Sequence, residues 1–241
     1  MKADIHSNDS FRDLSRKTRA QNRKGAAVWL VPALILLSII PLIFGVLRLH
    51  ELASGAEITP ENARFFASPL PVVLHIVGAG IFAIFGALQF VSRLWKRGNK
   101  WHRRAGRILV PCGLIVGLSG LWMTIFYPRP EDASGLLYVL RLLFGTGMVL
   151  AIILGFVAIR QRDIARHRAW MIRAYAIGLG AGTQVLTGIV GAVILGTPNE
   201  FESAVLMGAA WVINLAVAEW AIYRQPSKNG RLPSTVISDM Q

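Results

Sequence analysis

The stretch "KWHRRAGRILVPCGLIVGLSGLWMTIF", residues 100–126, opens with five basic or histidine side chains and continues as an almost uncharged apolar run. About 20 apolar residues in a helix cross the ~30 Å hydrocarbon layer of a bilayer. Buried helices of water-soluble cores seldom stay apolar for this length. The stretch therefore predicts a transmembrane helix over 106–127, with its basic start at a membrane surface.

Working outward from this stretch, the chain contains five more apolar blocks of similar length. It has 241 residues, of which 54% are hydrophobic, and a formal net charge of +13. The sequence therefore predicts an all-α polytopic membrane protein: a 26–224 domain between a basic tail, 1–25, and a disordered tail, 225–241. The six predicted transmembrane spans are 26–47, 69–92, 106–127, 136–159, 171–196 and 203–223.

The distribution of basic residues predicts the orientation. Of the 26 Lys and Arg residues, 22 lie in the two tails and in the connections around 93–107 and 160–173. The other connections carry only Arg48, Arg64 and Arg129. Lys and Arg are retained on the cytoplasmic side of a membrane. We therefore expect a multi-pass protein of the inner (plasma) membrane, with both termini in the cytoplasm.

Composition also excludes several classes of function. No basic domain stands apart from the apolar blocks, so we expect no nucleic-acid partner, and we assign the excess charge to membrane insertion and anionic lipid headgroups. The single cysteine, Cys112, lies inside a span and excludes disulfides and cysteine-based metal sites. No nucleotide-binding loop, protease motif or zinc signature occurs, and the sequence favours a protein that is not an enzyme.

The chain contains a repeated pattern. "VLH" at 73–75 returns as "VLR" at 139–141, and His102 returns 65 residues later as His167. His102 and His167 are each followed by glycines at +11 and +15, which places small residues on one helix face. We infer two related hairpins, spans 2–3 and 4–5, flanked by spans 1 and 6. Such faces let membrane helices approach closely, within the chain or in an oligomer. The glycines are Gly113, Gly117, Gly178 and Gly182.

Two ionisable residues occupy matching places inside spans 2 and 4. His75 and Arg141 both lie near the outer ends of their helices. Ionisable groups inside a membrane are costly and mark functional sites. If the hairpins are repeats, the two side chains face each other. An unpaired buried charge costs several kcal/mol, so we predict that Arg141 contacts His75, a backbone carbonyl or a bound anion.

Other intramembrane polar residues have structural explanations. We expect Glu219 to pair with Arg107 or Arg173 at the inner surface. We expect Gln184 and Asn214 to form hydrogen bonds between helices.

The two His-Arg pairs at the inner ends of spans 3 and 5 have two interpretations. Arg103 and Arg168 can bind lipid phosphates beside His102 and His167. Alternatively, the arginines and a helix N-terminus keep both imidazoles neutral, which is the metal-binding form. In that case the two histidines converge on one haem iron. The candidate cofactor-binding residues are His75, His102, His167, Arg103, Arg168 and Arg141.

Three segments together resemble a known family: "LHIVGAGIFAIFGALQF" at 74–90, "KWHRRAGRIL" at 100–109 and "IRQRDIARHRAWMIRAYAIGLGAGTQ" at 159–184. The resemblance is to the bacterial predicted membrane proteins of domain of unknown function 2306, over roughly residues 70–190. It implies an integral membrane protein without an established activity. The positions that match the family pattern are His75, His102, Arg103, His167, Arg168, Trp170 and Arg173.

The overall plan is also similar to six-helix b-type cytochromes, in which a four-helix core carries haem. That resemblance implies a redox module, here with a single haem b or a quinone, because Arg141 stands where a second intramembrane histidine is expected. The sequence leaves this hypothesis open beside two others. One is a transporter of a small anion or proton, or a lipid-handling protein; the other is a membrane protein whose biochemical role is not established.

Overall fold

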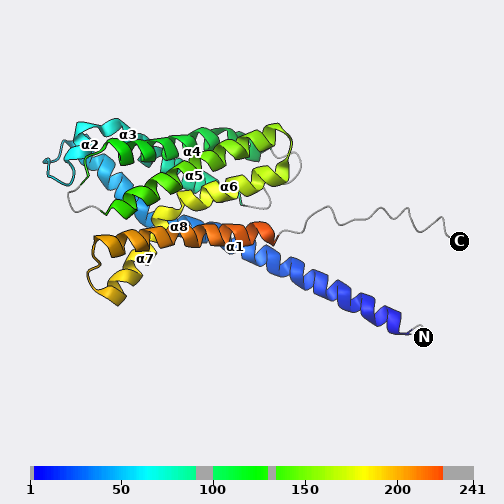
Figure 1. The fold of residues 1–241 in the computed structure, drawn as a ribbon. Helices are drawn as coiled ribbons and strands as arrows, with labels where there is room; N and C mark the ends of the chain where they lie inside the picture. Colours follow the sequence, from blue (N-terminus) through cyan, green and yellow to red (C-terminus); the bar gives the residue numbers. More distant parts are fainter. Residues whose placement is uncertain (1–2, 91–99, 130–133, 225–241) are drawn as a thin grey trace.

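The computed structural model describes residues 3–90, 100–129 and 134–224, with side chains from residue 29 onward. The described residues form helices joined by short turns (Figure 1). The helices are α1 (Ala3–Ser54), α2 (Ala63–Ala67), α3 (Pro69–Leu88), α4 (Lys100–Phe126), α5 (Gly135–Arg160), α6 (Ile164–Gly178), α7 (Gly180–Leu195) and α8 (Glu200–Tyr223).

The predicted all-α membrane architecture is confirmed. Five helices are long and apolar enough to cross a membrane, and α6 with α7 provides a sixth span if the pair is counted as one. α1 begins at Ala3, inside the predicted basic tail, while the predicted tail 225–241 lies outside the described residues. Duplication of the two hairpins stays a prediction.

The fifth span differs from the prediction of one continuous helix over 171–196. It breaks at Leu179, where α6 and α7 meet at a bend of 46°. A side chain from α8 compensates for the break: Asn214 Nδ2 donates to the carbonyl of Ala176 (3.0 Å), and the hydroxyl of Thr183 donates to Asn214 Oδ1 (2.8 Å). In hydrocarbon, broken helices occur where such partners satisfy the freed backbone groups. The expectation that Asn214 bonds between helices is confirmed.

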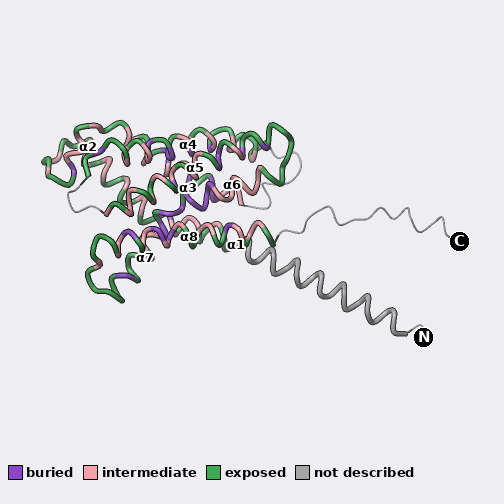
Figure 2. Tube along the Cα trace, viewed as in Figure 1, coloured by how far each residue is buried: buried purple, intermediate pink, exposed green. Residues whose placement is uncertain are grey.

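The core lies at the centre of the bundle of α3, α4, α5 and α6 (Figure 2). Phe82 of α3 is 4% exposed and occupies the space left by two glycines. A Cβ on Gly113 of α4 would lie 2.7 Å from the Phe82 ring, and one on Gly178 of α6 would lie 3.0 Å from it. Tyr175 packs beside this ring and donates its hydroxyl proton to the carbonyl of Ala83 (2.8 Å). One glycine of each predicted face therefore contacts the same side chain, whereas Gly117 packs against Val149 of α5 and Gly182 against Leu37 of α1.

α1, α7 and α8 lie outside this four-helix core and expose large apolar side chains (Figures 1 and 2). Leu36, Phe44 and Val193 are 69%, 67% and 81% exposed. An apolar surface of this extent suits contact with lipid chains, which do not penalise it as water does.

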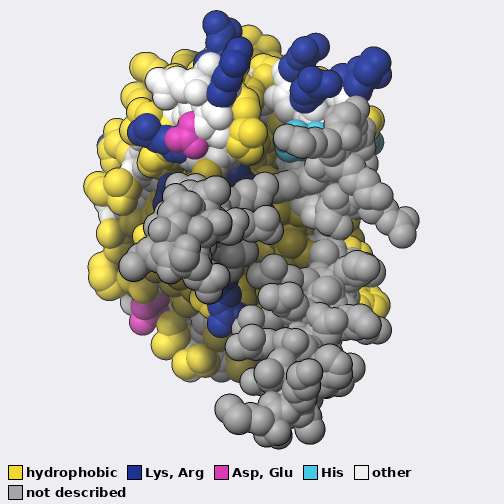
Figure 3. Space-filling view, turned by 90° about the vertical axis from the view of Figure 1, so that its right-hand side faces the viewer, with side chains coloured by type: hydrophobic (Ala, Val, Ile, Leu, Met, Phe, Trp, Pro, Cys, Tyr) yellow, Lys and Arg dark blue, Asp and Glu magenta, His cyan; other side chains and the backbone are white. Residues whose placement is uncertain are grey.

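The bundle has two distinct ends. α1 begins and α8 ends at one of them, which we call the tail end, and α2 lies at the other, the α2 end (Figure 1). Lys and Arg side chains gather at the tail end (Figure 3). Arg173 of α6 donates to both carboxylate oxygens of Glu219 on α8, at 2.5 and 2.9 Å. The predicted pairing of Glu219 with an arginine is thus confirmed, with Arg173 as the partner.

Candidate functional site

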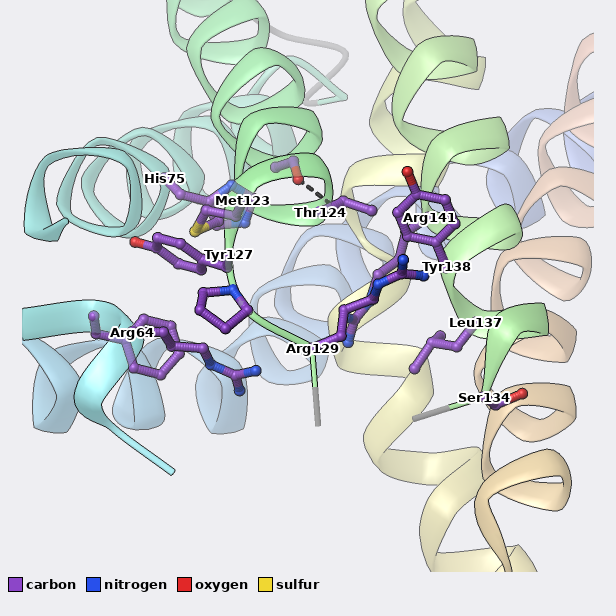
Figure 4. Close-up of a pocket in the computed structure, with 13 residues that line it drawn as sticks. Arg64, His75, Met123, Thr124, Tyr127, Arg129, Ser134, Leu137, Tyr138 and Arg141 are labelled. Atoms are coloured by element: carbon purple, nitrogen blue, oxygen red, sulfur yellow. Dashed lines mark hydrogen bonds between the residues drawn. The ribbon is translucent and has the colours of Figure 1, made fainter. Parts of the chain in front are cut away.

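A cavity of about 340 Å³ opens between α2, α4 and α5 at the α2 end (Figure 4). This is within the usual size range of small-molecule sites. It is lined by polar and aromatic side chains and by three arginines. The lining residues are Arg64, Phe65, His75, Gly120, Met123, Thr124, Tyr127, Pro128, Arg129, Ser134, Leu137, Tyr138 and Arg141.

Hydrogen bonds fix the short helix α2 against the end of α1. Asn62 donates from Nδ2 to Glu51 Oε1 (2.6 Å) and to the carbonyl of Glu57 (3.0 Å). Its Oδ1 accepts from the amide of Thr59 (2.7 Å). Asn62 is buried, so these bonds satisfy its amide group. The result is that Arg64, two residues later, is held at the edge of the cavity.

The charge around the cavity is positive. Arg129 stacks over the ring of Tyr138 (4.3 Å to its centroid), and Arg64 lies over Phe65 (4.9 Å). The Nε atom of Arg64 is buried and has no hydrogen-bond partner in the described part of the chain. Across residues 3–90, 100–129 and 134–224, no carboxylate lines the cavity. Three guanidinium groups therefore face one space without a described counter-charge.

The ring of His75 packs against α4. Its Nδ1 is 3.1 Å from the carbonyl oxygen of Val116 and 3.2 Å from Ser119 Oγ, which itself donates to the carbonyl of Ile115 (2.6 Å). A carbonyl only accepts, so we assign the proton to Nδ1. A Cβ on Gly120 would lie 3.4 Å from the ring. The small residue lets the ring approach, and Nε2 becomes the nitrogen available to the cavity.

The predicted pair therefore meets in one cavity. His75 comes from α3 and Arg141 from α5, and both line the same space (Figure 4). No hydrogen bond joins them, and none links Arg141 to a backbone carbonyl within the described residues, so a bound anion is the remaining predicted partner. The sequence did not single out Arg64 and Arg129, because each lies in a connection where an isolated arginine carries no periodic signal.

The two His-Arg pairs lie at the tail end, as predicted. Both precede the apolar part of a helix, His102 in the first turn of α4 and His167 in the first turns of α6. The turn into α6 is tight: Arg162 has φ +63°, and Asp163 Oδ1 accepts from the amide of Arg166 (2.9 Å). This turn brings His167 back onto α5.

The histidines of the two His-Arg pairs lie at the tail end, each near the start of its helix. His167 Nδ1 donates to the carbonyl of Gly155 (2.8 Å), a bond that orients the ring and leaves Nε2 as the other nitrogen of the ring. His102 is within electrostatic interaction range of His167. Arg103 is exposed and Arg168 is half-buried beside them. Convergence of the two histidines on one atom stays a prediction, as does a haem or quinone there.

The six candidate residues do not form one site. His75 and Arg141 line the cavity at the α2 end, while His102, Arg103, His167 and Arg168 lie at the tail end. No group of three or more His, Cys, Asp or Glu side chains capable of holding a metal occurs among the described residues. A single cofactor held by all six residues is therefore ruled out by their separation along the bundle.

Comparison with known proteins identifies the family. Residues 72–222 match the family described as predicted membrane protein (DUF2306). The chain belongs to this DUF2306 family. The match runs from α3 through α8 and thus includes the four-helix core, both His-Arg pairs and most of the cavity wall. Arg64 precedes the matched region. The search of curated proteins and the search of solved structures each found no match.

Proposed function

We propose that this DUF2306 protein binds a small anionic group, of the phosphate or sulfate type, in the cavity at the α2 end. The observation that carries the proposal is the set of three arginines, Arg64, Arg129 and Arg141, around one cavity without a described carboxylate. Guanidinium groups bind oxyanions through paired, charge-assisted hydrogen bonds. Such binding would serve the transport of a small anion or the handling of lipid headgroups.

Electrostatics favours this occupant. Charges buried in or near hydrocarbon cost several kcal/mol each unless they are paired. Arg48, by contrast, is already neutralised by Glu51 through a short ion pair (2.5 Å). The charge of Arg141 has no such partner among the described residues. An anion that enters the cavity would offset the cost of all three guanidinium groups at once, and this supports binding of an anion over binding of a neutral ligand.

We propose further that the α2 end faces away from the cytoplasm. Support comes from the 22 Lys and Arg residues assigned to the other side, against three in the outward connections. Reporter domains fused after residues 60, 98, 132, 164 and 199 should alternate in location, starting outside. The measurement is the activity of reporters that work on one side of the membrane only. A cytoplasmic signal after residue 60 or 132 would contradict this orientation.

The binding test uses sulfate as the probe. Full-length protein in a neutral detergent is titrated with sodium sulfate in a calorimeter, against sodium chloride at equal ionic strength. Arg64→Gln and Arg141→Gln should each weaken sulfate binding by about tenfold or more, since a hydrogen bond to a charged group is worth ~1.5–3 kcal/mol. Arg104→Gln is the matched control, because Arg104 is an exposed arginine at the tail end.

Further arms identify the source of the anionic group. Phosphatidylglycerol presents the same phosphate chemistry on a lipid, so displacement of sulfate by this lipid points to a headgroup, and unchanged sulfate binding points to a free anion. Glu131 and Asp132 follow Arg129 in the sequence and lie outside the described residues. The double variant E131Q/D132N shows whether their carboxylates compete. The proposal fails if the unmodified protein binds neither sulfate nor lipid, or if R64Q and R104Q bind sulfate equally.

A further inference from the structure

We infer that the cavity takes up its anion together with a proton carried by His75, so that protonation of this imidazole and anion binding strengthen each other. The inference rests on the proposed anion-binding function and names the form in which the ligand is held. The ligand class is an oxyanion bound with one proton from solvent, which gives the site a means of coupling anion uptake to a proton gradient.

The first step is the state of the ring. Nδ1 donates to the carbonyl of Val116 and the hydroxyl oxygen of Ser119, so this nitrogen keeps its proton in either charge state. Nε2 is therefore the atom that gains or loses a proton. With Nε2 unprotonated, the ring offers an anion only a lone pair. Once Nε2 is protonated, the ring offers it a charged donor that adds to the three guanidinium groups.

The second step is to identify the charged and titratable groups that the neighbouring elements place around the His75 ring. α2, the turn after α4, and α5 present the cations Arg64, Arg129 and Arg141, and α4 presents the neutral Ser119. Two tyrosines, Tyr127 and Tyr138, also line the cavity.

The described side chains of the two other neighbouring helices, α1 and α6, add no free charge beside the ring. At its α2 end, α1 carries the closed ion pair Arg48–Glu51 and the exposed His50. α6 presents Tyr175, whose hydroxyl is bonded to Ala83, two turns away from His75 along α3. α3 itself has no charged residue over Pro69–Leu88.

The third step is the coupling. Like charges disfavour one another, so the three guanidinium groups that line the same cavity oppose protonation of His75 while the site is empty. An anion reverses the sign of the local field and removes this opposition. By linkage, a bound anion strengthens proton binding by the same factor by which protonation strengthens anion binding. Anion affinity therefore rises as the pH falls. Among the described lining residues, His75 is the group that changes charge near neutral pH, because free arginine and tyrosine side chains titrate far above it.

The test measures sulfate affinity against pH. Sulfate stays a dianion throughout, so any pH dependence belongs to the protein. Affinity should rise about tenfold from about pH 8 to about pH 5.5, the range in which an imidazole gains its charge. In His75→Gln, which keeps a hydrogen-bond donor, the affinity should be flat over this range. His50→Gln is the matched control, since His50 is an exposed histidine at the same end of the protein, and it should keep the full pH dependence.

A second measurement needs no variant and remains decisive if His75→Gln does not fold. Calorimetry of sulfate binding in two cationic buffers with different ionisation enthalpies gives the number of protons taken up. Uptake of about half a proton per sulfate around neutral pH, the amount that a tenfold change in affinity over this range requires by linkage, supports the inference. Sulfate binding without proton uptake, or an unchanged pH dependence in His75→Gln, overturns it while leaving the proposed function intact. Absence of sulfate binding at every pH overturns the proposed function itself.

Discussion

Replacing Gly182 with alanine is expected to destabilise the folded protein more than any other single-methyl change considered. A Cβ at this position of α7 would lie 2.2 Å from the backbone carbonyl oxygen of Leu37 on α1. A backbone atom cannot rotate away, so the two helices must separate. Overpacking of this kind costs ~1–3 kcal/mol and occasionally more. By the scaling of soluble domains, a loss of about 3 kcal/mol lowers the melting temperature by roughly 6–12 °C.

Gly188 provides the matched control on the same helix. No atom lies within 4 Å of the position that its Cβ would take. Gly188→Ala should therefore leave the melting temperature unchanged or raise it, because alanine favours the helix by up to ~1 kcal/mol over glycine. Tryptophan fluorescence during heating in a neutral detergent measures both variants. If G182A and G188A melt together, the close contact between α1 and α7 is wrong.

Phe82→Ala should destabilise the four-helix core by about 3 kcal/mol, the lower end of the range for Phe→Ala in protein cores. The ring is 4% exposed and fills the space beside Gly113 and Gly178, so its removal leaves a cavity bounded by three helices. We take the lower end because lipid chains are as apolar as the core. The lost packing remains, while most of the transfer free energy from water does not apply.

Phe85, one turn further along α3, is the control for this change. It is 38% exposed and lies outside the buried core cluster. Phe85→Ala should lower the melting temperature by much less than Phe82→Ala in the same fluorescence assay. Comparable losses in the two variants would show that the glycine faces of α4 and α6 do not close around Phe82.

Local sequence was sufficient for the membrane architecture. Apolar length identifies helices such as α3 and α5 because the thickness of hydrocarbon sets one number for every span. The break at Leu179 was not predictable in this way, because the span stays apolar through it. Its stabilisation comes from Asn214, a residue 35 positions later that reaches the freed carbonyl of Ala176 from α8. Only the packing of α8 against α6 and α7 decides whether that bond forms.

For the candidate site, too, the sequence determined one part and the tertiary structure another. By itself, the sequence determined that His75 and Arg141 are costly inside a membrane and need partners, because the penalty for an ionisable group there follows from residue type and depth alone. That Arg64 and Arg129 join them was decided by the tertiary structure. Both arginines lie in connections, where position depends on the contacts of Asn62 and Tyr127 with distant parts of the chain. A cavity is a property of the space between elements, and residues of one element do not specify it.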